Sequence, residues 1–213
     1  LSELAGKQIH FIGLGGAGMS GIARIMLARG ISVSGSDAKD STVLSGLKTL
    51  GAQVFIGHQA SNLGAADVLV VSSAIDQFNP EVAAAKTKGL TIFSRAQALA
   101  LLMSESKSVA VAGTHGKTTT TSMLTVALQQ AGLNPSFAIG GMINRGGTNA
   151  HLGSGEIFVA EADESDGSFL AYKPTAAIIT NIEMDHVDHF SSDAQLFAAF
   201  NDFINSIQPA GAL

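Results

Sequence analysis

SVAVAGTHGKTTTT, residues 108–121, contains the pattern that decides the fold of the second half of the chain. The apolar run at residues 108–112 is typical of a buried strand, and the segment from Lys117 to about Ala131 is typical of a helix. Glycines with a Lys-Thr pair between a strand and a helix indicate a phosphate-binding loop, whose backbone N–H groups cradle phosphate oxygens. Lys117 would neutralise β- and γ-phosphate oxygens, and the Thr118 hydroxyl would bind Mg²⁺.

This loop is shorter than the standard phosphate-binding loop. The standard spacing would put the first glycine at position 111, which is Val111 here, and the glycine stands at position 113 instead. The alternative interpretation is a Thr-rich helix start with an incidental lysine. Packing alone hardly explains Gly-Lys-Thr at the exit of a buried strand, so the loop predicts phosphate binding.

A second glycine-rich turn, GLGGAGMS, starts at Gly13. Gly13, Gly15 and Gly18 form G-x-G-x-x-G between a predicted strand at residues 8–13 and a helix that ends at Gly30. Such glycines let a diphosphate approach the helix N-terminus. Asp37 ends the next strand about 20 residues on, where it would bond a ribose hydroxyl. The usual ligand of this pattern is NAD, and the alternative is a tight turn without a ligand.

Around these two loops, short apolar runs alternate with amphipathic stretches, which predicts an α/β fold with parallel sheets. Ser41 and Asn79 are expected helix caps, and Pro80 and Glu81 strengthen the second helix start. Further strands are expected at residues 31–37, 53–57, 67–73, 91–93, 156–161 and 176–181, and further helices at 41–50, 79–88, 95–103 and 193–207. The polar stretch SESKS, residues 104–108, indicates a boundary between domains 1–106 and 107–213.

The stretch VAEADESDGSF carries four acids at the end of an apolar strand: Glu161, Asp163, Glu164 and Asp166. Such acids repel one another unless a cation or its water ligands lie among them. A solvated acidic loop is the alternative, because runs of charge are often simply hydrated. The nearby phosphate loop favours a metal site.

The stretch TNIEMDHVDH, residues 180–189, follows another apolar strand. Asp185, His186, Asp188 and His189 offer oxygen and imidazole ligands. For His189 the expected role is an ordinary polar surface group. His186 is the better candidate, because α/β sites assemble at the carboxyl ends of parallel strands.

The composition excludes several classes of protein. The net charge of −5 gives no electrostatic reason to expect nucleic acid or an anionic membrane surface as a partner. The chain has no cysteine, so it forms no disulfide or thiolate metal site, which fits a cytoplasmic protein. The sequence predicts no transmembrane helix and no signal peptide. It does not indicate the oligomeric state.

Four ordered motifs, GxGGxGMS, GTHGKTTT, EADESDxSF and TNIExDHxD, resemble the Mur ligase family over essentially the whole chain. The resemblance implies a Rossmann-like first domain that binds a UDP-sugar rather than NAD, followed by a P-loop ATPase domain. It implies that a carboxylate attacks the γ-phosphate of ATP to give an acyl phosphate. The amine of an amino acid then displaces phosphate.

The resemblance also implies residue roles. Lys117, Glu161 and His186 are the implied catalytic residues, with Asn181 beside the last two. The implied UDP-sugar residues are Gly13, Gly15, Gly16, Gly18, Met19, Ser20, Asp37, Ser72 and Ser73. The implied ATP residues are Gly113, Thr114, His115, Gly116, Lys117, Thr118 and Thr119. The implied ligands of Mg²⁺ are Thr118, Glu161 and His186, and the imidazole would also suit Mn²⁺.

Within the family, the motifs favour members that join L-alanine to UDP-N-acetylmuramate. A recycling ligase that adds a tripeptide is the alternative, but Ser165 stands where EADEYD would be expected. A nicotinamide-dependent oxidoreductase and a non-catalytic nucleotide-binding module are the alternatives from other classes. The family has a third, C-terminal domain, and nothing here corresponds to it. The expectation is therefore that the chain ends in the central domain and does not form the peptide bond alone.

Overall fold

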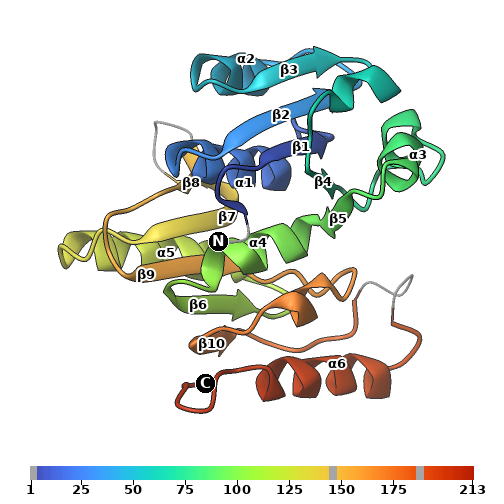
Figure 1. Cartoon of the computed structure of the whole chain (residues 1–213). Coiled ribbons are helices and arrows are strands. Elements are labelled where there is room, and N and C mark those ends of the chain that lie inside the picture. The colour runs from blue at the N-terminus through green and yellow to red at the C-terminus, as the bar shows by residue number, and fades with distance from the viewer. Residues whose placement is uncertain (1–3, 144–147, 186–189) are drawn as a thin grey trace. The chain divides into compact units, whose positions relative to one another are not determined.

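The computed structural model describes residues 4–143, 148–185 and 190–213 (Figure 1). The chain forms two compact units, Leu1–Leu99 and Ala100–Leu213. The division falls within helix α4 (Arg95–Met103), shortly before the stretch 104–108 where the sequence predicts the domain boundary. The bounds of α4 itself agree with the sequence prediction. In the described part of the chain, every helix is too short or too polar to span a lipid bilayer.

The first unit is built on a five-stranded parallel sheet with the order β3-β2-β1-β4-β5. Its strands are β1 (Gln8–Ile12), β2 (Ser32–Asp37), β3 (Gln53–Ile56), β4 (Val68–Val71) and β5 (Thr91–Ser94). Its other elements are α1 (Ala17–Ala28), α2 (Thr42–Thr49), the 3-10 helix η2 (Ala60–Leu63) and α3 (Pro80–Thr87). The chain adds β2 and β3 on one side of β1 and then β4 and β5 on the other, so the strand order reverses at β1. The carboxyl ends of β1, β2 and β4 at this point define the usual ligand crevice of such sheets.

Local signals fix the helix ends of this unit. The Ser41 hydroxyl accepts a hydrogen bond from the Leu44 N–H at 3.3 Å, and the Asn79 side chain accepts one from the Glu81 N–H at 2.9 Å. Both are N-caps, as predicted. The α1 C-terminus is followed by Gly30 with φ +77°, a conformation that favours glycine.

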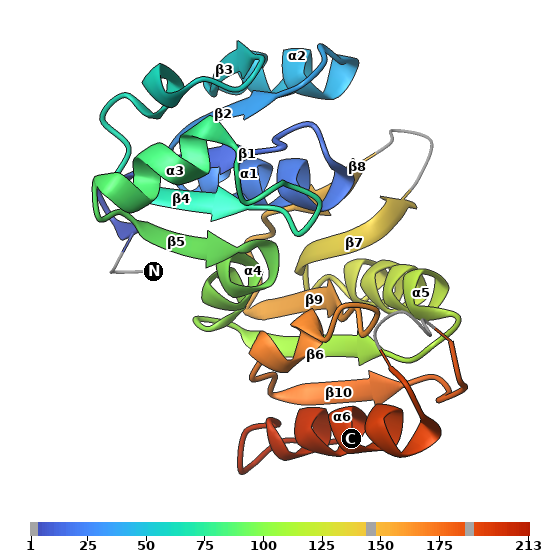
Figure 2. The same cartoon turned by 90° about the vertical axis from the view of Figure 1, so that its right-hand side faces the viewer.

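The second unit has a five-stranded sheet with the order β10-β6-β9-β7-β8. Its strands are β6 (Lys107–Ala112), β7 (Ser136–Ile143), β8 (Thr148–His151), β9 (Ile157–Glu161) and β10 (Ala176–Ile179). Its helices are α5 (Lys117–Gln130), the 3-10 helix η3 (Ser168–Ala171) and α6 (Asp193–Asn205). Strands β10, β6, β9 and β7 run parallel, so their carboxyl ends lie at the same edge (Figure 2).

The α/β fold is therefore confirmed, and the second sheet is mixed because β8 pairs antiparallel with β7. The sequence pattern does not predict either of these strands. β7 contains Gly140 and Gly141, and β8 has the sequence TNAH, so neither carries the continuous apolar run of a buried strand.

Helix α6 lies beside β10 in both views (Figures 1 and 2). Its Phe200 and Phe203 rings pack on Phe169 of η3, at centroid distances of 5.3 and 5.0 Å. These rings and Leu196 form the buried part of the apolar stripe that the sequence predicts. Phe197 is the exception, with 51% of its surface exposed, because the helical period turns it away from the sheet.

Candidate functional site

The phosphate-loop motif lies between the end of β6 and the start of α5. Gly113 has φ +126°, and a Cβ at this position would overlap the Thr180 hydroxyl. Gly116 has φ +82° and caps α5 without a side chain. Both positions therefore require glycine because of their backbone conformation. Gly113 requires it also because the Thr180 side chain approaches closely. The α5 N-terminus begins at Lys117, as predicted.

The segment after β10 anchors this loop. The Thr180 hydroxyl donates to the His115 carbonyl at 2.6 Å. The Asn181 amide accepts from the His115 N–H at 3.0 Å and donates to its carbonyl at 2.9 Å. The Thr114 hydroxyl donates to the Glu183 carbonyl and accepts from the Glu183 N–H, each at 3.0 Å. The predicted TNIE motif thus fixes the shape of the phosphate loop.

Lys117 is held by three acceptors in this site. Its ammonium donates to the Gly113 carbonyl at 2.7 Å and to the Thr114 carbonyl at 3.2 Å. It also lies 3.0 and 2.9 Å from the two carboxylate oxygens of Glu164. Glu164 is fully buried, and the Lys117 side chain is 12% exposed. The acidic stretch was expected to need a cation, and the structure places a lysine ammonium on its buried member.

The next residue along α5 pairs with the other glutamate. The Thr118 hydroxyl lies 3.0 Å from both carboxylate oxygens of Glu161, and one of these oxygens also accepts from the Gly140 N–H at 2.8 Å. Hydroxyl and carboxylate oxygens are ligands that suit Mg²⁺, and adjacent ligands of an octahedral Mg²⁺ lie about 3 Å apart. These two residues therefore fit the predicted metal site.

His186, the third predicted metal ligand, lies outside the described residues, as do Asp188 and His189. Its role stays a prediction. Asp185 is described and is exposed. Within the described ranges, no three His, Asp or Glu side chains cluster closely enough to hold a metal ion by themselves.

The remaining acids of EADESD make local turns. Asp163 accepts from the Ser165 N–H at 3.1 Å, and Asp166 accepts from the Ser168 N–H at 2.9 Å. Such Asx turns shape the loop that leads into η3. The four acids therefore divide into two that face α5 and two that shape the loop.

Gly140 and Gly141 of β7 are functional candidates that the sequence analysis missed. A Cβ on Gly140 would lie 3.0 Å from the Glu161 carboxylate, and one on Gly141 would lie 2.7 Å from Thr118 Cγ2. A glycine pair inside a strand indicates close approach of another group, and this was the available signal.

We expect Gly141→Ala to weaken Mg²⁺-nucleotide binding about fivefold, since overpacking of about 1 kcal/mol would push Thr118 away from Glu161. Calorimetric titration with Mg²⁺ and the ATP analogue AMP-PNP measures this. Gly46→Ala is the matched control, because a Cβ on Gly46 meets nothing within 4 Å. Equal affinities of both variants would contradict the prediction.

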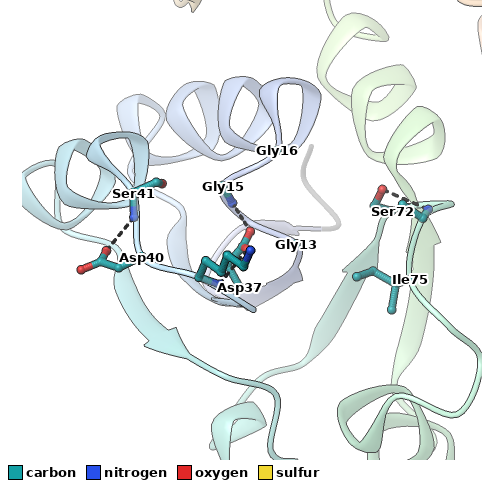
Figure 3. A pocket seen from close by; sticks show the side chains of 10 residues that line it. Gly13, Gly15, Gly16, Asp37, Asp40, Ser41, Ser72 and Ile75 are labelled. Atoms are coloured by element: carbon teal, nitrogen blue, oxygen red, sulfur yellow. Dashed lines mark hydrogen bonds between the residues drawn. The ribbon is translucent and has the colours of Figure 1, made fainter.

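The first unit contains a pocket of about 380 Å³ at the carboxyl ends of its central strands (Figure 3). Glycines 13, 15 and 16 form one wall, and Ser72 and Ile75 lie across the pocket from Asp37. Ala74 and the segment Lys39–Ser41 complete the lining. Five of the predicted UDP-sugar residues therefore share one pocket: Gly13, Gly15, Gly16, Asp37 and Ser72.

Asp37 bonds the glycine loop directly. Its carboxylate accepts from the Gly15 N–H at 2.8 Å and from the Lys39 N–H at 3.4 Å. The carboxylate thus occupies a loop amide that the diphosphate hypothesis assigned to a ligand. A ligand in this pocket would meet Asp37 as a hydrogen-bond acceptor, which suits a sugar hydroxyl better than a phosphate.

The other predicted residues of this site lie around the pocket and are not among its lining residues. Met19 and Ser20 are buried in α1, with 2% and 4% of their surface exposed. Ser73 is exposed. Gly18 lies against Arg95, because a Cβ there would lie 2.9 Å from Arg95 Cδ.

A buried polar network around Glu81 lies next to this pocket. Glu81 of α3 is fully buried and accepts from the Ser36 hydroxyl at 2.5 Å, and His10 Nε2 lies 3.4 Å from it. Its other oxygen accepts from the Gln59 N–H at 3.1 Å and the Asn62 amide at 2.7 Å. Burial raises the pKa of Glu81, but hydrogen bonds from these four groups outweigh it and hold the pKa below the ordinary 4.5.

This network reaches the glycine loop through one residue. The Ser36 carbonyl accepts from the Gly13 N–H at 2.9 Å and from the Leu14 N–H at 3.0 Å. The Ser36 hydroxyl meanwhile contacts Glu81 and, at 2.9 Å, His58 Nδ1. Glu81 therefore positions the strand end that holds the loop. The sequence analysis assigned Glu81 only to the first helical turn.

The two units define an α/β protein with a glycine-loop pocket in one unit and a phosphate-loop motif in the other. Residues 8–107 match the family model described as "Mur ligase family, catalytic domain", and residues 111–213 match "Mur ligase middle domain". The chain belongs to the Mur ligase family.

Two curated relatives are UDP-N-acetylmuramate–L-alanine ligases. The one from Renibacterium salmoninarum is 57% identical over 206 residues, which are 97% of this chain and 44% of that protein. The one from Nocardioides sp. is 55% identical, over 97% of this chain and 46% of that protein. The chain thus spans less than half of the length of these relatives.

Two solved structures share the fold. A UDP-N-acetylmuramate:L-alanyl-γ-D-glutamyl-meso-diaminopimelate ligase from Neisseria meningitides is 35% identical, with a TM-score of 0.88 over 96% of this chain and 69% of that one. The UDP-N-acetylmuramate–alanine ligase of Thermotoga maritima is 32% identical, with a TM-score of 0.85 over 94% of this chain and 47% of that one.

Proposed function

We propose that this chain is part of an ATP-dependent ligase that joins L-alanine to UDP-N-acetylmuramate in the synthesis of peptidoglycan precursors. One observation carries the proposal: Lys117 and Thr118 begin a helix at a glycine-shaped loop and face two glutamates of the neighbouring strand end. A lysine and a hydroxyl at a glycine-shaped helix start, with carboxylates opposite, are the groups that bind phosphates and a divalent cation. The names of the 55–57% identical relatives support the substrates.

In this proposal, residues 1–106 bind the UDP-sugar and residues 107–213 bind ATP. The loop from Gly113 to Thr119 surrounds the phosphates, with the backbone N–H groups from Gly116 to Thr119 as donors, since the N–H groups of Thr114 and His115 donate to Asn181. Lys117 contacts the β- and γ-phosphate oxygens. Thr118 and Glu161 would hold Mg²⁺, together with His186. The bound cation would supply charge neutralisation on the phosphates. The carboxylate of the UDP-sugar attacks the γ-phosphate and ADP leaves, which gives an acyl phosphate. The amine of L-alanine then attacks the acyl carbon, and the amide forms as phosphate leaves and the nitrogen loses a proton.

The protein's contribution to this chemistry is positioning and electrostatic stabilisation. The hydrogen bonds from Thr180 and Asn181 hold the loop in shape, so the N–H groups do not reorganise when phosphate binds. Glu161 is held by the Gly140 N–H and stays oriented toward α5.

A tripeptide-adding ligase is the second candidate function, since the Neisseria structure carries such a name. Two observations favour the L-alanine ligase. The relatives named for L-alanine are 55–57% identical, against 35% for the tripeptide ligase. Ser165 also retains the EADESD form of the acidic motif.

We expect the chain to bind UDP-N-acetylmuramate at least about tenfold more tightly than NADH, because Asp37 and the glycine loop would receive a UDP-sugar in this family. Separate calorimetric titrations with the two ligands measure this. Lys117→Met serves as the control, since it lies in the second unit and should leave the UDP-sugar affinity unchanged. Comparable or tighter binding of NADH would support the oxidoreductase alternative instead.

A further inference from the structure

The phosphate-loop lysine forms an ion pair with a buried carboxylate. The Lys117 ammonium lies within 3.0 Å of both oxygens of Glu164, and the carboxylate is fully buried behind it. A buried charge pair at this distance interacts strongly, since water does not screen it. An incoming phosphate would therefore meet an ammonium whose charge is compensated by a carboxylate behind it.

The described part of the second unit offers no other lysine or arginine near the loop. Lys107 begins β6, and Lys173 precedes β10, so both lie at the opposite edge of the parallel sheet. Among the described residues, the charged side chains that contact Lys117 and Thr118 are Glu164 and Glu161, so this group carries one positive and two negative charges. Their net charge of −1 disfavours a polyphosphate that arrives without a cation.

We propose that Glu164 makes nucleotide binding depend on the divalent cation, so that the site selects metal-bound ATP over free ATP. This inference rests on the proposed function, because it assumes that the loop binds ATP. Free ATP would be repelled by Glu164 and Glu161 together. Metal-bound ATP carries less negative charge, and its cation is attracted to Thr118 and Glu161. Glu164 therefore acts through Lys117 and is a positioning residue.

The test is a pair of calorimetric titrations with AMP-PNP, one with Mg²⁺ and one with EDTA. The measured quantity is the ratio of the two affinities. Glu164→Gln should lower this ratio about tenfold relative to the wild type, mainly because metal-free binding becomes tighter once the Lys117 ammonium is released. Where metal-free binding by the wild type is below detection, detectable metal-free binding by the variant is the expected result.

Asp166→Asn is the matched control. It removes one negative charge from the same acidic stretch, and Asn keeps the oxygen that accepts from the Ser168 N–H. Asp166 is exposed and makes no hydrogen bond to Lys117, so the affinity ratio should stay within about twofold of the wild-type value. A fall as large as that of Glu164→Gln would overturn the proposal, because it would show a general charge effect.

Other outcomes also decide the inference. An unchanged ratio in Glu164→Gln, or equal weakening with and without Mg²⁺, would overturn it, since a purely structural role weakens both titrations. If Glu164→Gln does not fold, Glu164→Asp is used. Its shorter carboxylate should hold Lys117 less closely and lower the ratio by a smaller factor, whereas an unchanged ratio would count against the proposal. Failure of the wild type to bind AMP-PNP with Mg²⁺ would refute the proposed function itself.

Discussion

Replacement of Glu81 by alanine is expected to lower the free energy of unfolding by about 3–5 kcal/mol, the usual effect of breaking a buried charged network. Glu81 is fully buried, and its carboxylate accepts from the Ser36 hydroxyl, the Gln59 N–H and the Asn62 amide. Alanine would leave these donors without their acceptor in a site that water does not reach. It would also leave a cavity beneath the glycine loop.

Urea unfolding followed by far-ultraviolet circular dichroism measures this loss. The single tyrosine, Tyr172, is fully buried in the second unit, and the chain has no tryptophan. Its fluorescence therefore reports the second unit, and the dichroism reports both. Glu183→Ala, at an exposed glutamate, is the control and should change the free energy by less than about 0.5 kcal/mol. A dichroism midpoint unchanged by Glu81→Ala would show that the network contributes nothing.

The pKa of Glu81 gives this prediction a pH signature. The folded state lowers the pKa below 4.5, so the folded protein favours the ionised carboxylate. The resulting stability is fully present above the unfolded pKa and is lost as the pH falls through the lower folded pKa. The wild type should therefore exceed Glu81→Gln in stability by a constant amount above pH 4.5, and the difference should shrink below it. A difference that grows in acid would contradict the sign.

Local signals predicted most of the first unit because each acts within a few residues. Ser41 and Asn79 cap helices through their own turns, and the apolar residues of β1 and β4 are dense enough to identify. The pair of strands β7 and β8 was not predicted, because β8 is polar and β7 contains Gly140 and Gly141, which lie against Glu161 and Thr118. These glycines are explained by contacts with residues far away in the sequence, and such contacts leave no periodic pattern in the strand itself.

The residues of the candidate sites also divide into those that sequence motifs predict and those that only the fold identifies. Lys117, Thr118 and Glu161 were predicted from motifs, and the structure brings them together. The partner of Lys117 could not be chosen among four neighbouring acids, because only the backbone path after β9 decides that Glu164 turns inward. Glu81 was missed for a related reason. Its sequence position suits a helix start, while its carboxylate partners lie 19 to 71 residues away.

The second large effect is expected at Lys117. We expect Lys117→Met to weaken binding of Mg²⁺ and AMP-PNP roughly 10- to 150-fold, since charge-assisted hydrogen bonds contribute about 1.5–3 kcal/mol. Methionine has a similar length and fills the same space without the ammonium. The same variant should also be less stable, because Glu164 would keep a buried carboxylate without its counterion.

Loss of stability and loss of affinity are separated by the double variant Lys117→Met/Glu164→Gln, which removes both charges of the pair. It should recover most of the unfolding free energy, because neither charge is then buried alone, while its affinity for Mg²⁺ and AMP-PNP stays low. Recovery of wild-type affinity would mean that the lysine serves only to neutralise Glu164 and does not contact the phosphates. If both the single and the double variant have low affinity, and the double variant alone regains stability, the phosphate contact is assigned to the Lys117 ammonium itself.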